Sequence, residues 1–104
     1  MKVMLYRDGR PGVVTRLPEE DPMADIAELL GGEVELTPLN RRLSLVVRKD
    51  TTGLPERYEI HWMDKAPEPV AGDCVVVARL PNLMLGTMGP EDIKRAGEFV
   101  HVRG

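Results

Sequence analysis

AELLGGEVELTPL, residues 27–39, runs from a leucine-rich segment through two glycines into alternating glutamates and hydrophobic residues. The apolar positions before and within it recur about every three to four residues, the period of a helix with one buried face; they are Met23, Ile26, Ala27 and Leu30. Asp21 can cap this helix by accepting hydrogen bonds from free amides, and Pro22 suits the first helical position. The residues after the glycines alternate in polarity, which predicts a strand.

The Gly31-Gly32 pair could cradle a ligand or could end the helix. A glycine loop that binds phosphate precedes a helix, because the anion lies at the free amides and the positive dipole end of the helix N-terminus. Here the glycines follow the helix, where free carbonyl groups would repel an anion. Gly31 takes the position where the chain often needs a left-handed conformation, which glycine adopts at little cost. We interpret the pair as a helix stop.

The strand predicted over residues 33–37 places its two hydrophobic residues on one face and its glutamates and threonine on the other. Pro38 ends this strand or lies on a sheet edge. After a turn at 39–42, LSLVV at 43–47 predicts the return strand. We expect the apolar faces to form the core, with these side chains nearly inaccessible: Leu30, Leu36, Leu45 and Val76.

The rest of the chain predicts mainly short strands. KVMLY and VVTRL make an opening hairpin, RYEIHWM a further strand, DKAPEPVAGD a loop, and CVVVARL a central strand because it is apolar on both faces; a short helix opens at Gly89-Pro90 and stops at Gly97, and FVHV makes a last strand. We therefore expect one domain over residues 1–104. Its fold class is α+β: a small, mostly antiparallel sheet, one main helix packed on a face and a short C-terminal helix.

The charge, the apolar runs and the cysteine count limit the classes of protein to which this chain can belong. A net charge of -3 and a pI near 5.4 are not the strongly basic balance of a general nucleic-acid binder. No apolar run has the length of a membrane span, and the N-terminus lacks the apolar region of a signal peptide. A single cysteine cannot form an internal disulfide. These features predict a soluble cytoplasmic protein with no membrane partner.

The order of motifs resembles a known family. After the amphipathic helix come LLGGEVELTPL, VVRKDTTGLPE, AGDCVVVARL and MGPEDIKRA. Over residues 20–97 this order is similar to the phage- and mobile-element-associated family called domain of unknown function 3846, although YEIHWM stands here in place of a shorter polar segment. The family has no established activity. The resemblance therefore implies a context, a small protein encoded by phages, plasmids or integrated elements, and no catalytic residues.

Catalytic and metal sites find little support in the sequence. His61 and His101 lie far apart on predicted strands, and with Cys74 they give at most three ligands of the three or four that zinc needs. Cys74 begins an apolar run, which is typical of a small buried side chain. Ser44 lies inside a predicted strand, and no phosphate-binding or dinucleotide-binding loop is present. We expect no enzyme activity, no metal and no cofactor.

Basic residues at turns and strand ends form a candidate contact surface, which we call the arginine rim: Arg41, Arg42, Arg48, Lys49 and Arg57. If the hairpins over 34–60 lie side by side, this rim could meet a phosphate backbone or an acidic protein patch. It could equally be a solvated rim that resists aggregation between sheet edges. The two ends of the predicted 43–47 strand could also separate its basic residues.

Two further candidates for partner binding are Trp62 and the Glu33/Glu35 pair. Trp62 shares a strand face with Tyr58 and Ile60, so it lies at the border of the core or, if exposed, provides a contact for a protein. Glu33 and Glu35 lie on the same strand face about 7 Å apart, either as an exposed face or as acid–base groups.

Together these observations predict a protein that acts by binding. Given the mobile-element context, we expect an accessory or anti-defence factor that occupies a surface of a host or phage protein, an inhibitor of a host defence nuclease being one case. The alternative is an accessory protein that binds nucleic acid through the arginine rim.

Overall fold

The computed structural model describes residues 1–81 and 84–103. In these ranges the chain forms β1 (Lys2–Tyr6), β2 (Val13–Arg16), α1 (Pro22–Leu30), β3 (Val34–Pro38), β4 (Leu43–Arg48), β5 (Glu56–Ile60), β6 (Glu68–Ala71), β7 (Cys74–Arg79), β8 (Leu85–Gly86), α2 (Pro90–Phe99) and β9 (Val100–Val102). All strand pairs are antiparallel. The α+β fold predicted from the sequence is confirmed.

The strands form a large sheet and a small sheet. Within the described ranges, six strands make the large sheet, in the order β2-β1-β7-β4-β3 with β8 also pairing with β7, and three make the small sheet, in the order β6-β5-β9. The central position of β7 confirms the prediction from its two apolar faces. Pro38 lies on the edge strand β3, as proline in a strand requires.

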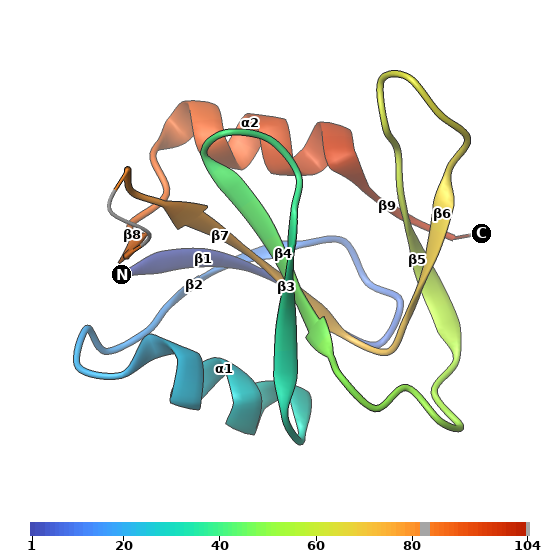
Figure 1. The fold of residues 1–104 in the computed structure, drawn as a ribbon, viewed down its shortest axis with the longest axis horizontal. Coiled ribbons are helices and arrows are strands. Elements are labelled where there is room, and N and C mark those ends of the chain that lie inside the picture. Colours follow the sequence, from blue (N-terminus) through green and yellow to red (C-terminus); the bar gives the residue numbers. More distant parts are fainter. Residues whose placement is uncertain (82–83, 104) are drawn as a thin grey trace.

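The large sheet is covered on both faces. Figure 1 shows α1 and α2 on opposite sides of it, with the β5–β6 hairpin beside it. The α1 face buries the following side chains: Val3, Leu17, Ile26, Leu30, Val46, Val75 and Val77. The other face packs against α2 and the small sheet, because alternate residues of β4 and β7 point to opposite sides.

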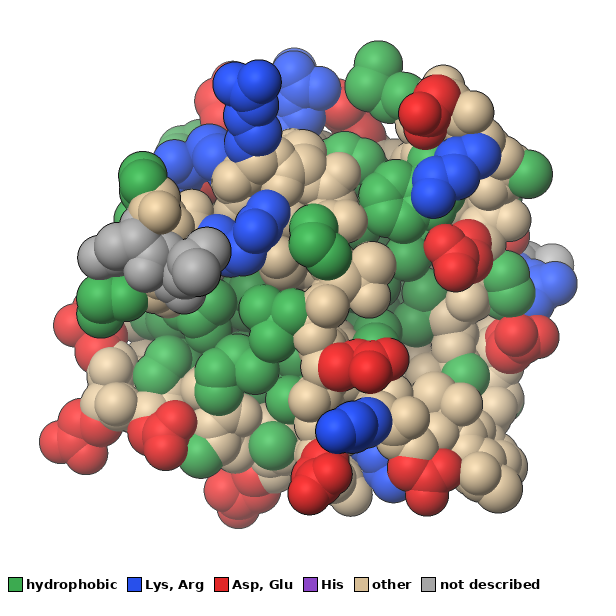
Figure 2. Space-filling view, viewed as in Figure 1, with side chains coloured by type: hydrophobic (Ala, Val, Ile, Leu, Met, Phe, Trp, Pro, Cys, Tyr) green, Lys and Arg blue, Asp and Glu red, His purple; other side chains and the backbone are tan. Residues whose placement is uncertain are grey.

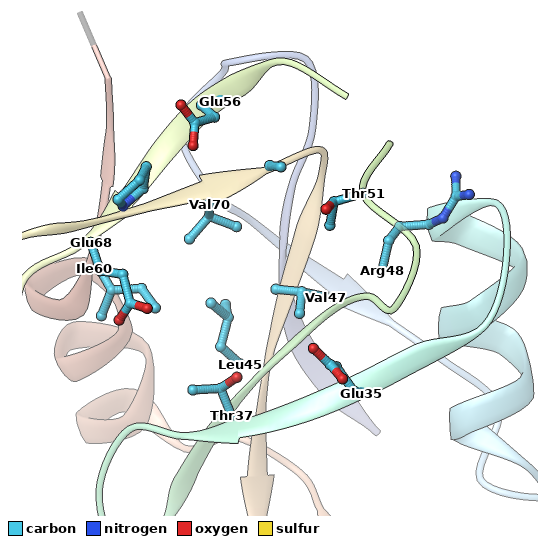
Figure 3. A pocket seen from close by; sticks show the side chains of 12 residues that line it. Glu35, Thr37, Leu45, Val47, Arg48, Thr51, Glu56, Ile60, Glu68 and Val70 are labelled. Atoms are coloured by element: carbon cyan, nitrogen blue, oxygen red, sulfur yellow. The ribbon is translucent and has the colours of Figure 1, made fainter. Parts of the chain in front are cut away.

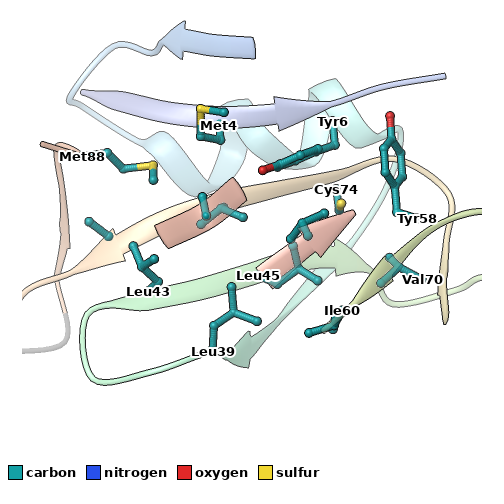
Figure 4. Packing of buried hydrophobic residues seen from close by; sticks show 14 residues of the cluster. Met4, Tyr6, Leu39, Leu43, Leu45, Tyr58, Ile60, Val70, Cys74 and Met88 are labelled. Carbon is teal, nitrogen blue, oxygen red and sulfur yellow. The ribbon is translucent and has the colours of Figure 1, made fainter. Parts of the chain in front are cut away.

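The second core cluster joins the small sheet to the large one (Figure 4). Leu45 and Val76 of the large sheet and Ile60 and Val70 of the small sheet all belong to it. The rings of Tyr6 and Tyr58 meet edge to face with their centroids 5.6 Å apart. The Tyr58 hydroxyl donates a hydrogen bond of 2.7 Å to the Arg10 carbonyl oxygen. This cluster fixes the small sheet relative to β4.

The ends of α1 follow the predicted signals. The Asp21 carboxylate accepts a hydrogen bond of 3.2 Å from the Ala24 amide, and Pro22 opens the helix. Gly31 has φ of +86°, in the left-handed region, and its amide donates to the Ala27 carbonyl oxygen at 2.9 Å. The interpretation of Gly31 as a helix stop is confirmed.

The prediction for residues 57–73 is partly wrong. The strand predicted through Met63 ends at Ile60, because its partner β9 begins at Val100, directly after α2. The stretch predicted as a loop contains β6, an edge strand that pairs with β5 and accommodates Pro69. The prolines and charged residues around β6 weaken its local strand signal, and its partner β5 lies outside the stretch predicted as a loop.

Two predictions about single residues are also wrong. Gly97 does not stop α2, which continues to Phe99, because the buried Ala96 and partly buried Phe99 pack against the core and offset the glycine. Leu36 shares a face with Val34 as predicted, but its side chain is 41% exposed because β3 is an edge strand. Leu30, Leu45 and Val76 are buried as predicted.

Candidate functional site

A groove of about 300 Å³ lies between the large sheet and the small sheet. Its floor is apolar and comes from both sheets: Leu45 and Val47 of β4, Ile60 of β5 and Val70 of β6. Figure 3 shows Leu45, Val47 and Val70 pointing toward one another. In the space-filling view, hydrophobic side chains line a hollow between β3 and β6, with acidic side chains at its margins (Figure 2).

The rim of the groove carries the carboxylates of Glu35, Glu56 and Glu68. Glu56 is paired with Arg103 at 3.3 Å, and Glu68 accepts a hydrogen bond of 3.2 Å from the Trp62 indole nitrogen. In the described part of the chain, neither Glu35 nor Glu68 forms an ion pair. Glu35 and Glu68 therefore place negative charge beside an apolar floor.

Arg48 also lines the groove, but its guanidinium is turned toward α1 (Figure 3). Its Nη1 atom lies 3.5 Å from the Leu30 carbonyl oxygen, close to the helix stop at Gly31. A cation there interacts favourably with the negative end of the helix dipole. Arg48 therefore stabilises the end of α1 and leaves the groove acidic.

The structure separates the two ends of the arginine rim, although Arg48 and Arg57 line a common pocket. Arg41 and Arg42 precede β4, whereas Arg48 and Lys49 lie at its other end, about 20 Å away for a strand of this length. Arg57 lies on β5, and its Nη1 atom is 3.8 Å from Asp8. A role of this rim in binding stays a prediction.

Arg42 makes a structural ion pair. Its Nε and Nη2 atoms donate to both carboxylate oxygens of Asp92, at 3.0 and 2.9 Å. Asp92 also accepts a hydrogen bond of 3.0 Å from the Gly89 amide at the start of α2. The hydrogen bonds from Arg42 hold the pKa of Asp92 below its ordinary value. This pair joins the β3–β4 turn to α2.

Of the remaining predicted contact residues, Glu35 lines the groove and Trp62 contacts its rim through Glu68. Trp62 is partly buried at the border of the core, with its ring 6.4 Å from that of Phe99 and the Lys65 ammonium 4.7 Å from its centroid. Glu35 lies on the groove rim. Glu33 is exposed just before β3, and its carbonyl oxygen accepts a hydrogen bond from the Lys49 amide.

The nucleophile candidates are buried. Burial raises the pKa of the Cys74 thiol to about 12, which leaves it protonated at neutral pH. Ser44 is 1% exposed within β4. The prediction that the two histidines lie far apart is wrong, because the rings of His61 and His101 stack with their centroids 3.8 Å apart. Among the described residues, no group of three or more His, Cys, Asp or Glu side chains could hold a metal ion.

Sequence reasoning missed the groove, because Glu68 and Val70 belong to the stretch predicted as a loop. The alternation from Glu68 to Ala71 is a weak strand signal that the neighbouring prolines obscured. The pairing of β5 with β9, about 40 residues later in the chain, had no local signal at all.

Comparisons of the chain with protein-family models, with curated proteins and with solved structures each found no match. Among the described residues, no helix is long and apolar enough to cross a membrane. The resemblance to domain of unknown function 3846 stays a prediction. The geometry of the groove is therefore the basis for a functional proposal.

Proposed function

We propose that the protein is a protein-binding module without a catalytic site, and that its groove takes up a segment of a partner protein carrying Lys or Arg beside apolar side chains. The observation that carries this proposal is an apolar floor beside the exposed carboxylates of Glu35 and Glu68. Apolar contacts supply affinity at a protein interface, and complementary charge supplies specificity and speeds encounter.

The state of the candidate nucleophiles supports a binding role over catalysis. An activated nucleophile needs a lowered pKa or an adjacent base. The pKa of Cys74 is raised instead, and Ser44 lies buried within the large sheet.

The resemblance drawn from the sequence supports a host protein as the partner. Proteins that bind nucleic acid carry clusters of Lys and Arg, so the surface of a defence nuclease is one that the acidic groove would fit. Occupation of that surface would inhibit the nuclease by competing with its nucleic acid. The origin of this protein from a mobile element is part of the same proposal.

The proposal is tested with a fluorescein-labelled, acetylated and amidated peptide of sequence KVKVKVK. We expect it to bind the wild-type protein, and the acidic peptide EVEVEVE not to bind. Glu35→Gln/Glu68→Gln should weaken binding by about threefold to tenfold, since exposed charge pairs contribute about 0.2–1 kcal/mol each. Binding should also weaken as salt is raised, because exposed charges are screened. Fluorescence anisotropy measures each affinity.

The matched control is Glu20→Gln/Glu28→Gln, which removes two exposed carboxylates outside the groove and keeps the same net charge as the test variant. Equal loss in both variants would show that net charge, and not the groove, attracts the peptide. Binding of a DNA duplex in place of the peptide, with a steep dependence on salt, would favour the nucleic-acid alternative. Absence of binding to KVKVKVK, whether or not DNA binds, would overturn the proposal.

A further inference from the structure

The hydrogen bonds at both ends of the β3–β4 ladder fix which way each backbone group of β3 points. The Lys49 amide donates to the Glu33 carbonyl oxygen at 2.9 Å, and the Leu39 amide donates to the Leu43 carbonyl oxygen at 2.9 Å. In an antiparallel ladder, hydrogen-bonded pairs alternate with non-hydrogen-bonded pairs. With the observed register, the odd-numbered residues of β3 bond to β4 and the even-numbered residues turn their N–H and C=O groups outward.

The outward groups are the N–H and C=O of Val34 and Leu36 and the C=O of Pro38. Within the described ranges, β3 pairs with β4 alone, and these groups form no hydrogen bond with another described residue. Exposed edge groups of this kind are a template for an added strand. The Leu36 side chain, 41% exposed, lies beside them.

A strand added at this edge would have two different faces. On the groove face its side chains would lie beside Glu35 and Thr37, since these residues line the groove. On the α1 face they would lie beside Val34 and Leu36, which share the side of Val46. Cross-strand neighbours of opposite charge, or of matching apolar character, stabilise a sheet. The edge therefore selects alternating basic and apolar residues.

The charges disfavour a second copy of the chain as the occupant. If two β3 strands paired around Leu36, each Glu35 would lie opposite Thr37 of the other copy, and the two Glu35 carboxylates would be diagonal neighbours on the groove face. Like charges close together in a sheet are destabilising. Pro38, opposite Val34 in that register, would also have no N–H to donate.

We propose that a Lys- or Arg-bearing extended segment of the partner binds by adding an antiparallel strand to β3, with its basic side chains over the groove and its apolar side chains beside Leu36. This inference rests on the proposed function and adds its geometry. The backbone of the segment would supply affinity, and the alternation of its side chains would supply selectivity.

N-methylated forms of the KVKVKVK peptide test this geometry. The peptide residue opposite Leu36 is a valine whose backbone N–H points toward β3. Methylation of the backbone nitrogen of the central valine should therefore weaken binding by about fivefold or more, which corresponds to the loss of one net hydrogen bond. The backbone N–H of a lysine in this peptide points away from β3, so methylation of that backbone nitrogen should change binding by less than about twofold. These peptides have the same composition and charge, so they control for each other.

A protein variant tests the same contact from the other side. Leu36→Pro removes an outward N–H, and the same strand already accommodates Pro38 in an equivalent outward position. Leu36→Ala is the control, because it shortens the side chain and keeps the N–H. We expect Leu36→Pro to bind at least about fivefold more weakly than Leu36→Ala. Saturation with peptide should also slow the exchange of the Val34 and Leu36 amide protons by about tenfold or more.

Each outcome separates this inference from the proposed function. Equal binding of both N-methylated peptides, with binding still lost in Glu35→Gln/Glu68→Gln, would overturn strand addition and keep the groove. Absence of peptide binding would overturn both. A dimer that dissociates in Leu36→Pro, seen by sedimentation, would assign the edge to a second copy and overturn the inference.

Discussion

Truncation of Leu45 and of Leu36 to alanine should have very different effects on stability. The two residues lie on neighbouring strands, but Leu45 is fully buried and Leu36 is 41% exposed. Each change removes three carbon atoms, a loss of about 2.4 kcal/mol in transfer free energy for a buried side chain at about 0.8 kcal/mol per carbon. For Leu45 a cavity cost adds to this, giving about 3 kcal/mol.

For Leu36 the exposed fraction reduces the transfer loss to about 1.4 kcal/mol at most, and an open edge leaves no enclosed cavity, so we expect about 1 kcal/mol. Urea denaturation followed by circular dichroism measures both values. A difference of about 2 kcal/mol should move the urea midpoints apart by about 1 M or more. Equal costs, or a larger cost for Leu36→Ala, would mean that the α1 face of β3 is covered and that its edge is closed to a partner.

Other predictions concern the helix ends, pH and thiol reactivity. Gly97→Ala should raise the free energy of unfolding by about 0.5–1 kcal/mol, because Gly97 lies within α2 and an added Cβ meets no described atom within 4 Å; thermal melting tests this. Gly31→Val should lower the free energy of unfolding by about 1 kcal/mol or more because residue 31 has a positive φ, and Gly31→Asn should lower it less. A melting temperature of Gly31→Val equal to that of the wild type would refute the helix-stop interpretation. The lowered pKa of Asp92 adds stability above the ordinary value of 3.8, and this is lost as pH falls through the lowered pKa; urea midpoints of Asp92→Asn should therefore depend less on pH below about 4 than those of the wild type. Cys74 should resist iodoacetamide at pH 8 until the protein is unfolded, and rapid labelling of the native protein would contradict its burial.

Local signals predicted the elements that depend on near neighbours. The cap at Asp21 and the stop at Gly31 involve hydrogen bonds to residues within about four positions, so the sequence contains both partners. The β3–β4 hairpin follows from alternation and a short turn. The apolar residues on both faces of β7 placed it inside a sheet without any knowledge of its neighbours.

The candidate site could not be predicted in the same way, because its parts come from distant segments. Val70 reaches the groove floor only because β6 pairs with β5, and β5 is held in place by β9. Arg42 pairs with Asp92, 50 positions later in the chain, and no local pattern predicts that ion pair.

The α+β class, the limits of α1 and the central place of β7 could all be predicted from the amino-acid sequence, since each depends on periodicity or on hydrogen bonds between near neighbours. The small sheet, the groove beside β3 and the exposure of Leu36 follow instead from the way the chain folds in three dimensions. These features depend on which strands meet across long loops and on how far α1 extends over the sheet. Contacts between distant residues determine both, and no local pattern of residues encodes them.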